Sequence, residues 1–127
     1  MSDKLKLRTG DSLLLLNAPT GFIPEFPYSN DPAARKAFDA VLLFVADQAE
    51  LGRFAETAVS SLKPDGLLWV AYPKKTSKQS SDLNRDQGWD LLKAKGFEGV
   101  ALVALDETWS ALRLRHKAFV GSTRRRQ

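Results

Sequence analysis

Residues 38–71 read FDAVLLFVADQAELGRFAETAVSSLKPDGLLWVA, and this stretch decides the fold. Two short apolar runs, residues 41–46 and 67–71, lie within it. Between them, apolar residues recur at helical spacing from Leu51 to Leu62 and form one stripe. Short continuous apolar runs are typical of strands that are covered on both faces of a parallel sheet. The stretch therefore predicts a strand–helix–strand unit.

The ends of the helix in this unit are marked by polar residues and by turn formers. Asp47 can cap the first turn, and Glu50 three residues later completes an arrangement that resembles a capping box. Pro64, Asp65 and Gly66 then end the helix and turn the chain into the next strand.

The same alternation extends in both directions from this unit. Apolar runs at residues 13–16 and 100–105 predict a strand on either side. A second helix is expected from about Leu83 to Lys95, with Gly96 as the left-handed residue that follows it. Alternating strands and helices predict right-handed crossover connections and a largely parallel sheet.

The last predicted strand has a different pattern. Leu112 and Leu114 alternate with Arg113 and Arg115, which predicts one buried face and one wet face. It follows the preceding strand so closely that the two must pair as an antiparallel hairpin. We therefore expect an α/β fold, a three-layer Rossmann-like mixed sheet that is mainly parallel with a C-terminal antiparallel hairpin.

Length and composition limit the classes of protein that remain. The chain has 127 residues, no cysteine and one histidine, which excludes disulfides, cysteine-ligated zinc and multi-histidine metal sites. We expect one domain over residues 1–120 and a basic, disordered tail at 121–127. No apolar run approaches the ~20 residues that a transmembrane helix needs, and no secretory signal is visible. The composition predicts a soluble, cytoplasmic protein with no membrane partner.

The positive charge is concentrated near the C-terminus. The net charge is +4, yet residues 1–107 hold thirteen bases and fifteen acids and are therefore net negative. The remaining bases form a cluster without any acid. These bases are Arg113, Arg115, Lys117, Arg124, Arg125 and Arg126. Nucleic-acid binding through this cluster is one hypothesis, but with few aromatic residues nearby we expect no specific binding.

Two sequence motifs and the last predicted elements resemble the class I methyltransferase family. Residues 38–44 resemble its fourth strand, and residues 62–70 resemble its junction from helix to fifth strand. Gly96-Phe97 and the final hairpin resemble its last elements. The resemblance covers residues 38–117 and implies a methyltransferase-like fold. With the family's second and third strands lost or reduced, this resemblance implies the strand order first, second, third, last, fourth.

The cofactor half departs from that family's pattern. The family places an acid in its first strand and then Gly-x-Gly-x-Gly, which lets the backbone approach S-adenosylmethionine. Here Leu15 stands in place of the acid, Asn17 and Pro19 replace two glycines, and Gly21 remains. The added side chains obstruct close approach, and proline lacks an N–H. The segment from Gly21 to Phe38 is also too short for the family's second and third strands with their helices.

We therefore expect no cofactor, and specifically no S-adenosylmethionine. The predicted function is a non-catalytic or regulatory module that binds a small anionic ligand. The alternative is a divergent S-adenosylmethionine-dependent methyltransferase.

The whole chain is also similar to a family of small, uncharacterised bacterial proteins that shorten this fold. The shared phrases are Asn-Ala-Pro-x-Gly-Phe at residues 17–22, Leu-Trp-Val-Ala-x-Pro-Lys-Lys at residues 68–75, and Asp-Glu-Thr-Trp-Ser at residues 106–110. This resemblance implies no particular activity, and it leaves the oligomeric state open.

Ligands of open α/β sheets bind beyond the carboxyl ends of the strands, where the strand order reverses. In the expected topology, the loops at this edge begin at Asn17, Asp47, Tyr72 and Asp106. The candidate ligand-binding residues are Asn17, Thr20, Gly21, Asp47, Lys74, Lys75, Asp106, Glu107 and Trp109. No catalytic residue and no metal site are predicted.

Several candidates have structural alternatives. Lys74 and Lys75 suit a phosphate or carboxylate, or they belong to a solvated loop. Asp106 and Glu107 suit acid–base chemistry or a cation, or Asp106 holds a hairpin turn. Trp109 is either a stacking wall for a ligand or a ring that closes the hairpin against the core.

Overall fold

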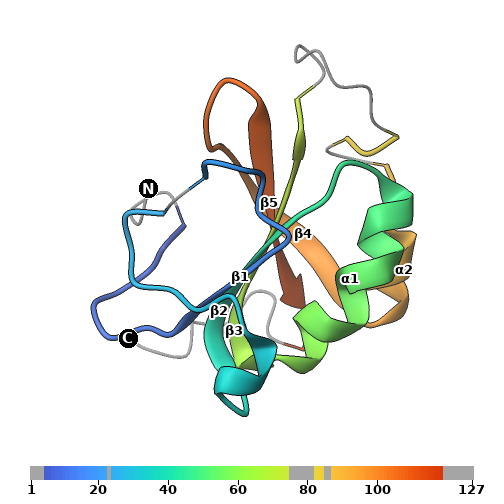
Figure 1. Cartoon of the computed structure of the whole chain (residues 1–127). Coiled ribbons are helices and arrows are strands. Elements are labelled where there is room, and N and C mark those ends of the chain that lie inside the picture. The colour runs from blue at the N-terminus through green and yellow to red at the C-terminus, as the bar shows by residue number, and fades with distance from the viewer. Residues whose placement is uncertain (1–4, 23, 75–81, 85–86, 119–127) are drawn as a thin grey trace.

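The computed structural model describes residues 5–22, 24–74, 82–84 and 87–118, and a five-stranded mixed sheet lies at its centre (Figure 1). The strands are β1 (Leu13–Leu16), β2 (Phe38–Phe44), β3 (Leu62–Pro73), β4 (Phe97–Ala104) and β5 (Trp109–His116). The sheet order is β1-β2-β3-β5-β4. The first three strands pair in parallel, and β5 is antiparallel to both β3 and β4. The predicted strand order and the C-terminal hairpin are confirmed.

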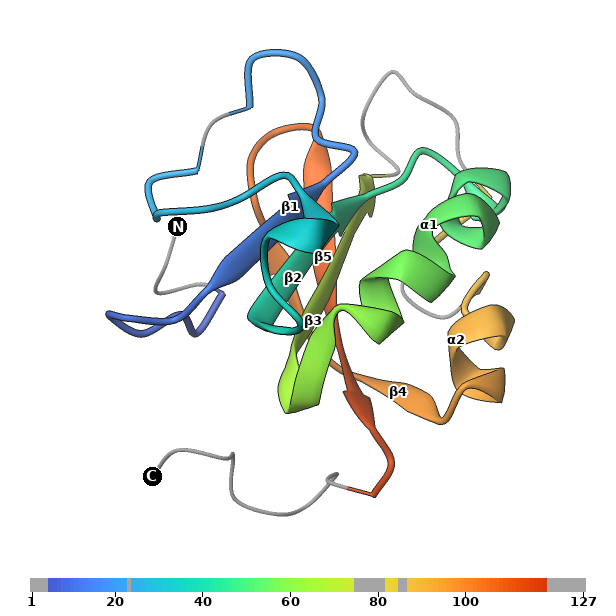
Figure 2. The same ribbon diagram turned by 60° about the horizontal axis from the view of Figure 1, so that its bottom comes forward.

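The two faces of the sheet are covered differently. Helices α1 (Gln48–Ser60) and α2 (Asp90–Ala94) pack on one face, where Leu51 and Leu92 join a single apolar core (Figure 2). The other face is covered by irregular chain, from which Leu5 and Phe22 enter a second core. The 3₁₀ turn η1 (Pro32–Ala34) has no buried residue. Of the three expected layers, the described residues form a helical layer, the sheet and a layer of irregular chain.

The free edge of β1 is partly paired by the connection between β1 and β2. The Leu15 N–H donates to Ser29 O at 2.8 Å, and the Ser29 N–H donates to Leu13 O at 2.9 Å. These two hydrogen bonds form one isolated parallel bridge between β1 and the short connection that leads to β2.

The predicted start of α1 is confirmed at its N-cap. Asp47 is the N-cap, and its Oδ1 accepts from the Glu50 N–H at 3.0 Å. Glu50 Oε1 accepts from the Ala46 N–H at 2.7 Å. The Asp47 bond is the predicted cap, whereas Glu50 accepts from Ala46, one residue before the N-cap, where a capping box would use the N–H of Asp47.

Helix α2 begins later than predicted. We expected a start near Leu83, but the helix begins at Asp90. Asn84 Oδ1 accepts from the Gln87 N–H at 2.9 Å, and Gly88 has φ +99°, so this segment forms a turn. Local bonds from asparagine compete with the helix in this way. The predicted helix end is confirmed, because Gly96 has φ +94° and its N–H donates to Lys93 O at 2.9 Å.

Two expectations about burial in the last strands are wrong. The run at residues 100–105 predicts a covered strand, yet most of β4 is exposed because it is an edge strand beside a helix of only five residues. The outer face of β5 is not wet, since Arg115 is buried and Arg113 is half-buried. The partner of Arg115 is described below.

No helix in the described ranges has both the length and the apolar character needed to span a membrane. The predicted tail at 121–127 and the candidate Lys75 lie outside the described residues.

Candidate functional site

The predicted site residues share one edge of the sheet. Strands β1, β2, β3 and β4 run in one direction, so the loops that follow them leave at the same edge, toward the top of Figure 1. We call these loops the carboxyl edge. Asn17, Asp47, Lys74 and Asp106 all lie on it, as the topology predicts. The shared edge is confirmed, and what it binds is a separate question.

Asn17 holds the turn after β1. It has φ +56°, and its side-chain Nδ2 donates to Phe44 O at 2.8 Å and to Glu50 Oε1 at 3.3 Å. The amide therefore ties the end of β1 to the end of β2 and to α1. Thr20 and Gly21 follow as exposed turn residues, with Gly21 at φ +87°.

Replacing Asn17 separates its backbone role from its hydrogen bonds. Asn17→Gly keeps the left-handed conformation but loses the bond to Phe44 O, and we expect a loss of about 1 kcal/mol in unfolding free energy. Asn17→Ala loses both, and we expect a loss of about 2 kcal/mol. Urea unfolding of both variants checks this order. Equal stability of the alanine variant and the wild type would contradict it.

Asp106 has a structural role in the β4–β5 turn. Its Oδ1 accepts from the Thr108 N–H and the Trp109 N–H, both at 2.8 Å. Thr108 O in turn accepts from the Lys74 N–H at 2.8 Å, which joins the turn to the end of β3. Glu107 is exposed. The two acids do not form a convergent pair, because Asp106 holds the turn.

An aromatic cluster lies beneath the carboxyl edge. Trp109 is buried and meets Phe44 edge-on, with ring centroids 5.1 Å apart and an interplanar angle of 83°. Phe22, from the loop after β1, also packs on Phe44, and the two ring centroids are 4.7 Å apart. Trp109 thus closes the hairpin against the core, in agreement with the structural alternative. The three rings fill the space at the ends of β1, β2 and β5.

Three of the hollows on the described part of the chain have linings that include no predicted site residue. The largest, about 540 Å³, lies between α2 and the β4–β5 hairpin. Its lining consists of Trp89, Lys93, Gly96, Phe97, Glu98, Gly99, Leu112, Leu114 and Lys117. We call it the α2 hollow. Hollows of about 260 Å³ and 170 Å³ lie beside the start of β3 and beside the starts of β1 and β2.

The sequence analysis missed the α2 hollow because its existence depends on a short helix. A helix from Leu83 would have covered more of the hairpin than Asp90–Ala94 does. The available signal was Asn84 with Gly88, which favours a turn over a helix.

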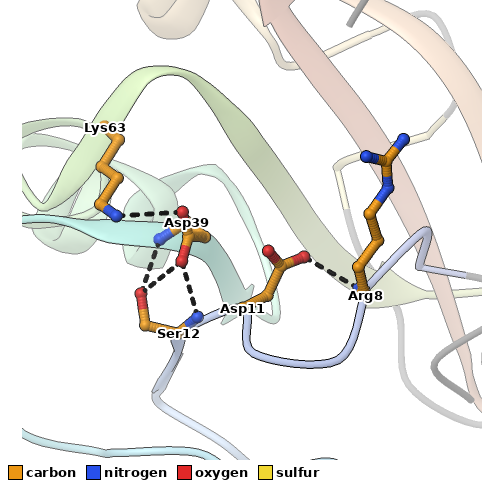
Figure 3. A network of polar contacts seen from close by, with 5 residues as sticks. All are labelled: Arg8, Asp11, Ser12, Asp39 and Lys63. Atoms are coloured by element: carbon orange, nitrogen blue, oxygen red, sulfur yellow. Dashed lines mark hydrogen bonds and ion pairs between the residues drawn. The ribbon is translucent and has the colours of Figure 1, made fainter. Parts of the chain in front are cut away.

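A polar network at the opposite edge also escaped the sequence analysis (Figure 3). Asp39 Oδ2 accepts from the Ser12 N–H at 2.8 Å and from the Ser12 hydroxyl at 3.0 Å, while Ser12 Oγ accepts from the Asp39 N–H at 2.9 Å. Lys63 Nζ donates to Asp39 Oδ1 at 3.1 Å. Nearby, Asp11 Oδ2 accepts from the Arg8 N–H at 2.9 Å. An acid inside an apolar strand was the signal, and the network cross-links β1, β2 and β3.

The network shifts the pKa of Asp39. Burial raises this pKa, but hydrogen bonds from the Ser12 backbone, Lys63 and the Ser12 hydroxyl together outweigh burial and hold it below its ordinary value of 3.8. Because the folded pKa is the lower one, the carboxylate stabilises the fold above the unfolded value, and this contribution is lost as pH falls through the folded pKa.

We therefore expect wild-type stability to decline as pH falls below about 4 and the Asp39→Asn variant to decline less over that window. Urea unfolding at pH values from 7 down to 3 measures both curves. Parallel curves for the two proteins would show that Asp39 is not linked to acid unfolding.

A buried ion pair explains the dry outer face of β5. Arg115 Nε and Nη2 donate to Asp65 Oδ1 and Oδ2 at 2.7 and 2.8 Å, and Asp65 has φ +54°. The hydrogen bond to Asp65 raises the pKa of Arg115. Burial and the charge of Arg115 lower the pKa of Arg113, whose buried Nε has no hydrogen-bond partner in the described structure.

Comparisons with known proteins support the fold. No family model matches the chain, and no curated protein matches it. The structure of LepI complex with SAM is similar, with a TM-score of 0.50 and 13% sequence identity. The match covers 91% of this chain but only 38% of LepI. At this identity the similarity concerns the fold alone. The chain has a mixed α/β sheet, and it spans less than half the length of that protein.

Proposed function

We propose that the chain is a non-catalytic module that binds a small anionic ligand on a shortened methyltransferase-like sheet. The observation that carries this proposal is the commitment of the carboxyl-edge side chains to the fold. Asn17, Asp47 and Asp106 each accept from or donate to backbone groups that hold a turn or a helix start. Groups used in this way are poor candidates for acids, bases or nucleophiles in a reaction.

The same edge argues against S-adenosylmethionine as a cofactor. The ribose and adenine of S-adenosylmethionine must come close to the backbone after the first strand, and glycines at that turn permit this approach. Here the Asn17 side chain crosses from β1 to β2, and Phe22 packs on Phe44 above the strand ends. These contacts occupy the approach with the chain's own atoms.

The second candidate is a divergent S-adenosylmethionine-dependent methyltransferase. The observation that favours it is the fold similarity to the structure of LepI complex with SAM. Fold similarity carries little weight for chemistry, because one fold hosts many functions.

Nucleic-acid binding is less favoured by the basic residues that the structure describes. Arg115 forms a salt bridge with Asp65, and the Nε atom of Arg113 is buried. The Arg115 guanidinium is therefore not free for a phosphate, and Arg113 is only half-buried but has one nitrogen out of reach of a phosphate.

The anion proposal is tested by thermal unfolding with inorganic phosphate, citrate and octanoate at constant ionic strength. A ligand at 100 times its Kd stabilises the fold by about 2.7 kcal/mol, which raises Tm by several degrees. The Lys74→Gln/Lys75→Gln variant tests the carboxyl edge as the location. If none of the three anions raises Tm, the anion-binding function is wrong.

A further inference from the structure

The α2 hollow has the size and the surface of a small-molecule site. Its volume of about 540 Å³ falls within the range of roughly 300–1,000 Å³ that is typical of such sites. Trp89 and Phe97 line it on one side, and Leu112 and Leu114 of β5 line it on the other. All four side chains belong to the apolar core on the helical face of the sheet. The apolar part of the lining therefore consists of side chains that are 1% to 7% exposed.

Apolar surface continues from the hollow along the hairpin. Leu102 pairs with Leu112 across β4 and β5, so the two side chains share a face. Leu102 is exposed, as is Val100 at the bulge in β4. A ligand with an extended apolar body can lie along this face.

The charged residues of the lining favour an anion. Lys93 of α2 and Lys117 beyond β5 both line the hollow, against one acid, Glu98. Within the described ranges, neither lysine forms an ion pair, whereas the neighbouring Lys95 pairs with Glu56 at 3.0 Å. The hollow thus combines apolar side chains with two lysine ammonium groups and one acid, so its lining carries a net positive charge.

We infer that the α2 hollow binds an amphipathic anion, an aliphatic or aromatic body that carries a carboxylate. The body lies against Trp89, Phe97 and Leu112, and the carboxylate faces Lys93 and Lys117. This inference rests on the proposed function, because it names the location and the chemical class of the anionic ligand. It places the ligand away from the carboxyl edge that sequence topology favoured.

The three tryptophans of the chain report on three different places. Trp89 lines the α2 hollow, and its Nε1–H donates to Asn84 O at 2.7 Å. Trp109 lies beneath the carboxyl edge. Trp69 is in the core of the opposite face, where its Nε1–H donates to Leu5 O at 2.9 Å. Each indole N–H gives its own cross-peak in a ¹⁵N-correlated spectrum, and Trp89→Phe assigns the relevant one.

The experiment titrates the ¹⁵N-labelled full chain with octanoate, with 1-octanol and with inorganic phosphate. We expect octanoate to move the Trp89 cross-peak and to leave that of Trp109 in place. The Lys93→Gln/Lys117→Gln variant should bind octanoate about fivefold to tenfold more weakly, since each exposed charge pair contributes modestly. Lys95→Gln removes one positive charge nearby, outside the hollow, and should alter the affinity less than twofold.

A second variant tests the hollow without removing charge. Gly99 lines the hollow, and a Cβ there would meet the Leu112 side chain at 3.3 Å. Gly99→Val inserts a branched side chain that suits a strand, and we expect it to fold and to abolish the octanoate shift of Trp89. An unchanged shift in this variant would overturn the location.

The remaining outcomes separate the two proposals. If phosphate or octanoate moves Trp109 and leaves Trp89 in place, the anion binds at the carboxyl edge, and the inference fails while the proposed function survives. If neither anion moves any cross-peak, both fail. If 1-octanol binds as tightly as octanoate, the carboxylate is not recognised and the anion assignment is wrong. The assignment is also wrong if octanoate moves the cross-peak only by changing the self-association of the chain.

Discussion

The Asp65→Asn variant is expected to lose about 3 kcal/mol of unfolding free energy, or roughly 10 °C in Tm. Asp65 and Arg115 form a two-point pair, and their side chains are only 6% and 9% exposed. Removing one partner leaves a buried charge without compensation, which costs more than the pair itself contributes. Asparagine tolerates the left-handed backbone at φ +54°, so the substitution isolates the charge.

Two further variants make this result specific to a buried pair. Lys95→Gln breaks the pair with Glu56, whose side chain is 79% exposed, and should change stability by less than about 0.5 kcal/mol. Adding Arg115→Leu to Asp65→Asn removes both charges and should recover much of the loss. Equilibrium urea unfolding at pH 7 measures all three. An Asp65→Asn variant as stable as Lys95→Gln would mean that the pair is not buried in solution.

Phe44→Ala is expected to cost about 4 kcal/mol. The Phe44 ring is 1% exposed and packs between Phe22 and Trp109. Truncation leaves a cavity at the centre of the aromatic cluster, and it removes two ring contacts in addition to the buried area. Urea unfolding measures the loss.

The matched control for Phe44 is Tyr28→Ala. Tyr28 is 44% exposed, so removing its ring should change stability by less than about 0.5 kcal/mol. If the two variants lose the same free energy, the Phe44 ring is not packed against Phe22 and Trp109 in solution.

The strand–helix–strand unit at residues 38–71 could be predicted because its signals are local. Apolar runs, a helical stripe, and Asp47 with Glu50 at capping distance all lie within a few residues of the elements that they specify. The short connection before β5 then forces an antiparallel hairpin. The strand order is implied by the family resemblance of residues 38–117, and the shared carboxyl edge follows from parallel strands joined by right-handed crossovers.

The features that could not be predicted depend on contacts distant in sequence. Arg115 is buried because Asp65, fifty residues earlier, adopts a left-handed conformation that presents its carboxylate. The alternation of Leu and Arg in β5 predicts a wet face and carries no information about that partner. Similarly, β4 has the composition of a central strand, and its exposure follows from its place at the edge.

The candidate site also combines features that the sequence predicts with features that depend on distant contacts. Topology places Asn17, Lys74 and Asp106 at one edge, and the structure agrees. The commitment of Asn17 and Asp106 to backbone groups requires coordinates, because asparagine and aspartate suit both turns and ligands. The α2 hollow depends on where a helix begins, and helix boundaries are the least certain part of a sequence-based prediction.

Our proposal is that the carboxyl edge of this sheet does not bind S-adenosylmethionine. Its most direct test is thermal unfolding of the full chain with S-adenosylmethionine or S-adenosylhomocysteine at millimolar concentration. A ligand present at 100 times its Kd would stabilise the fold by about 2.7 kcal/mol. We predict no change in Tm with either compound. A rise in Tm that grows with the concentration of either compound would contradict the account and would favour a divergent methyltransferase.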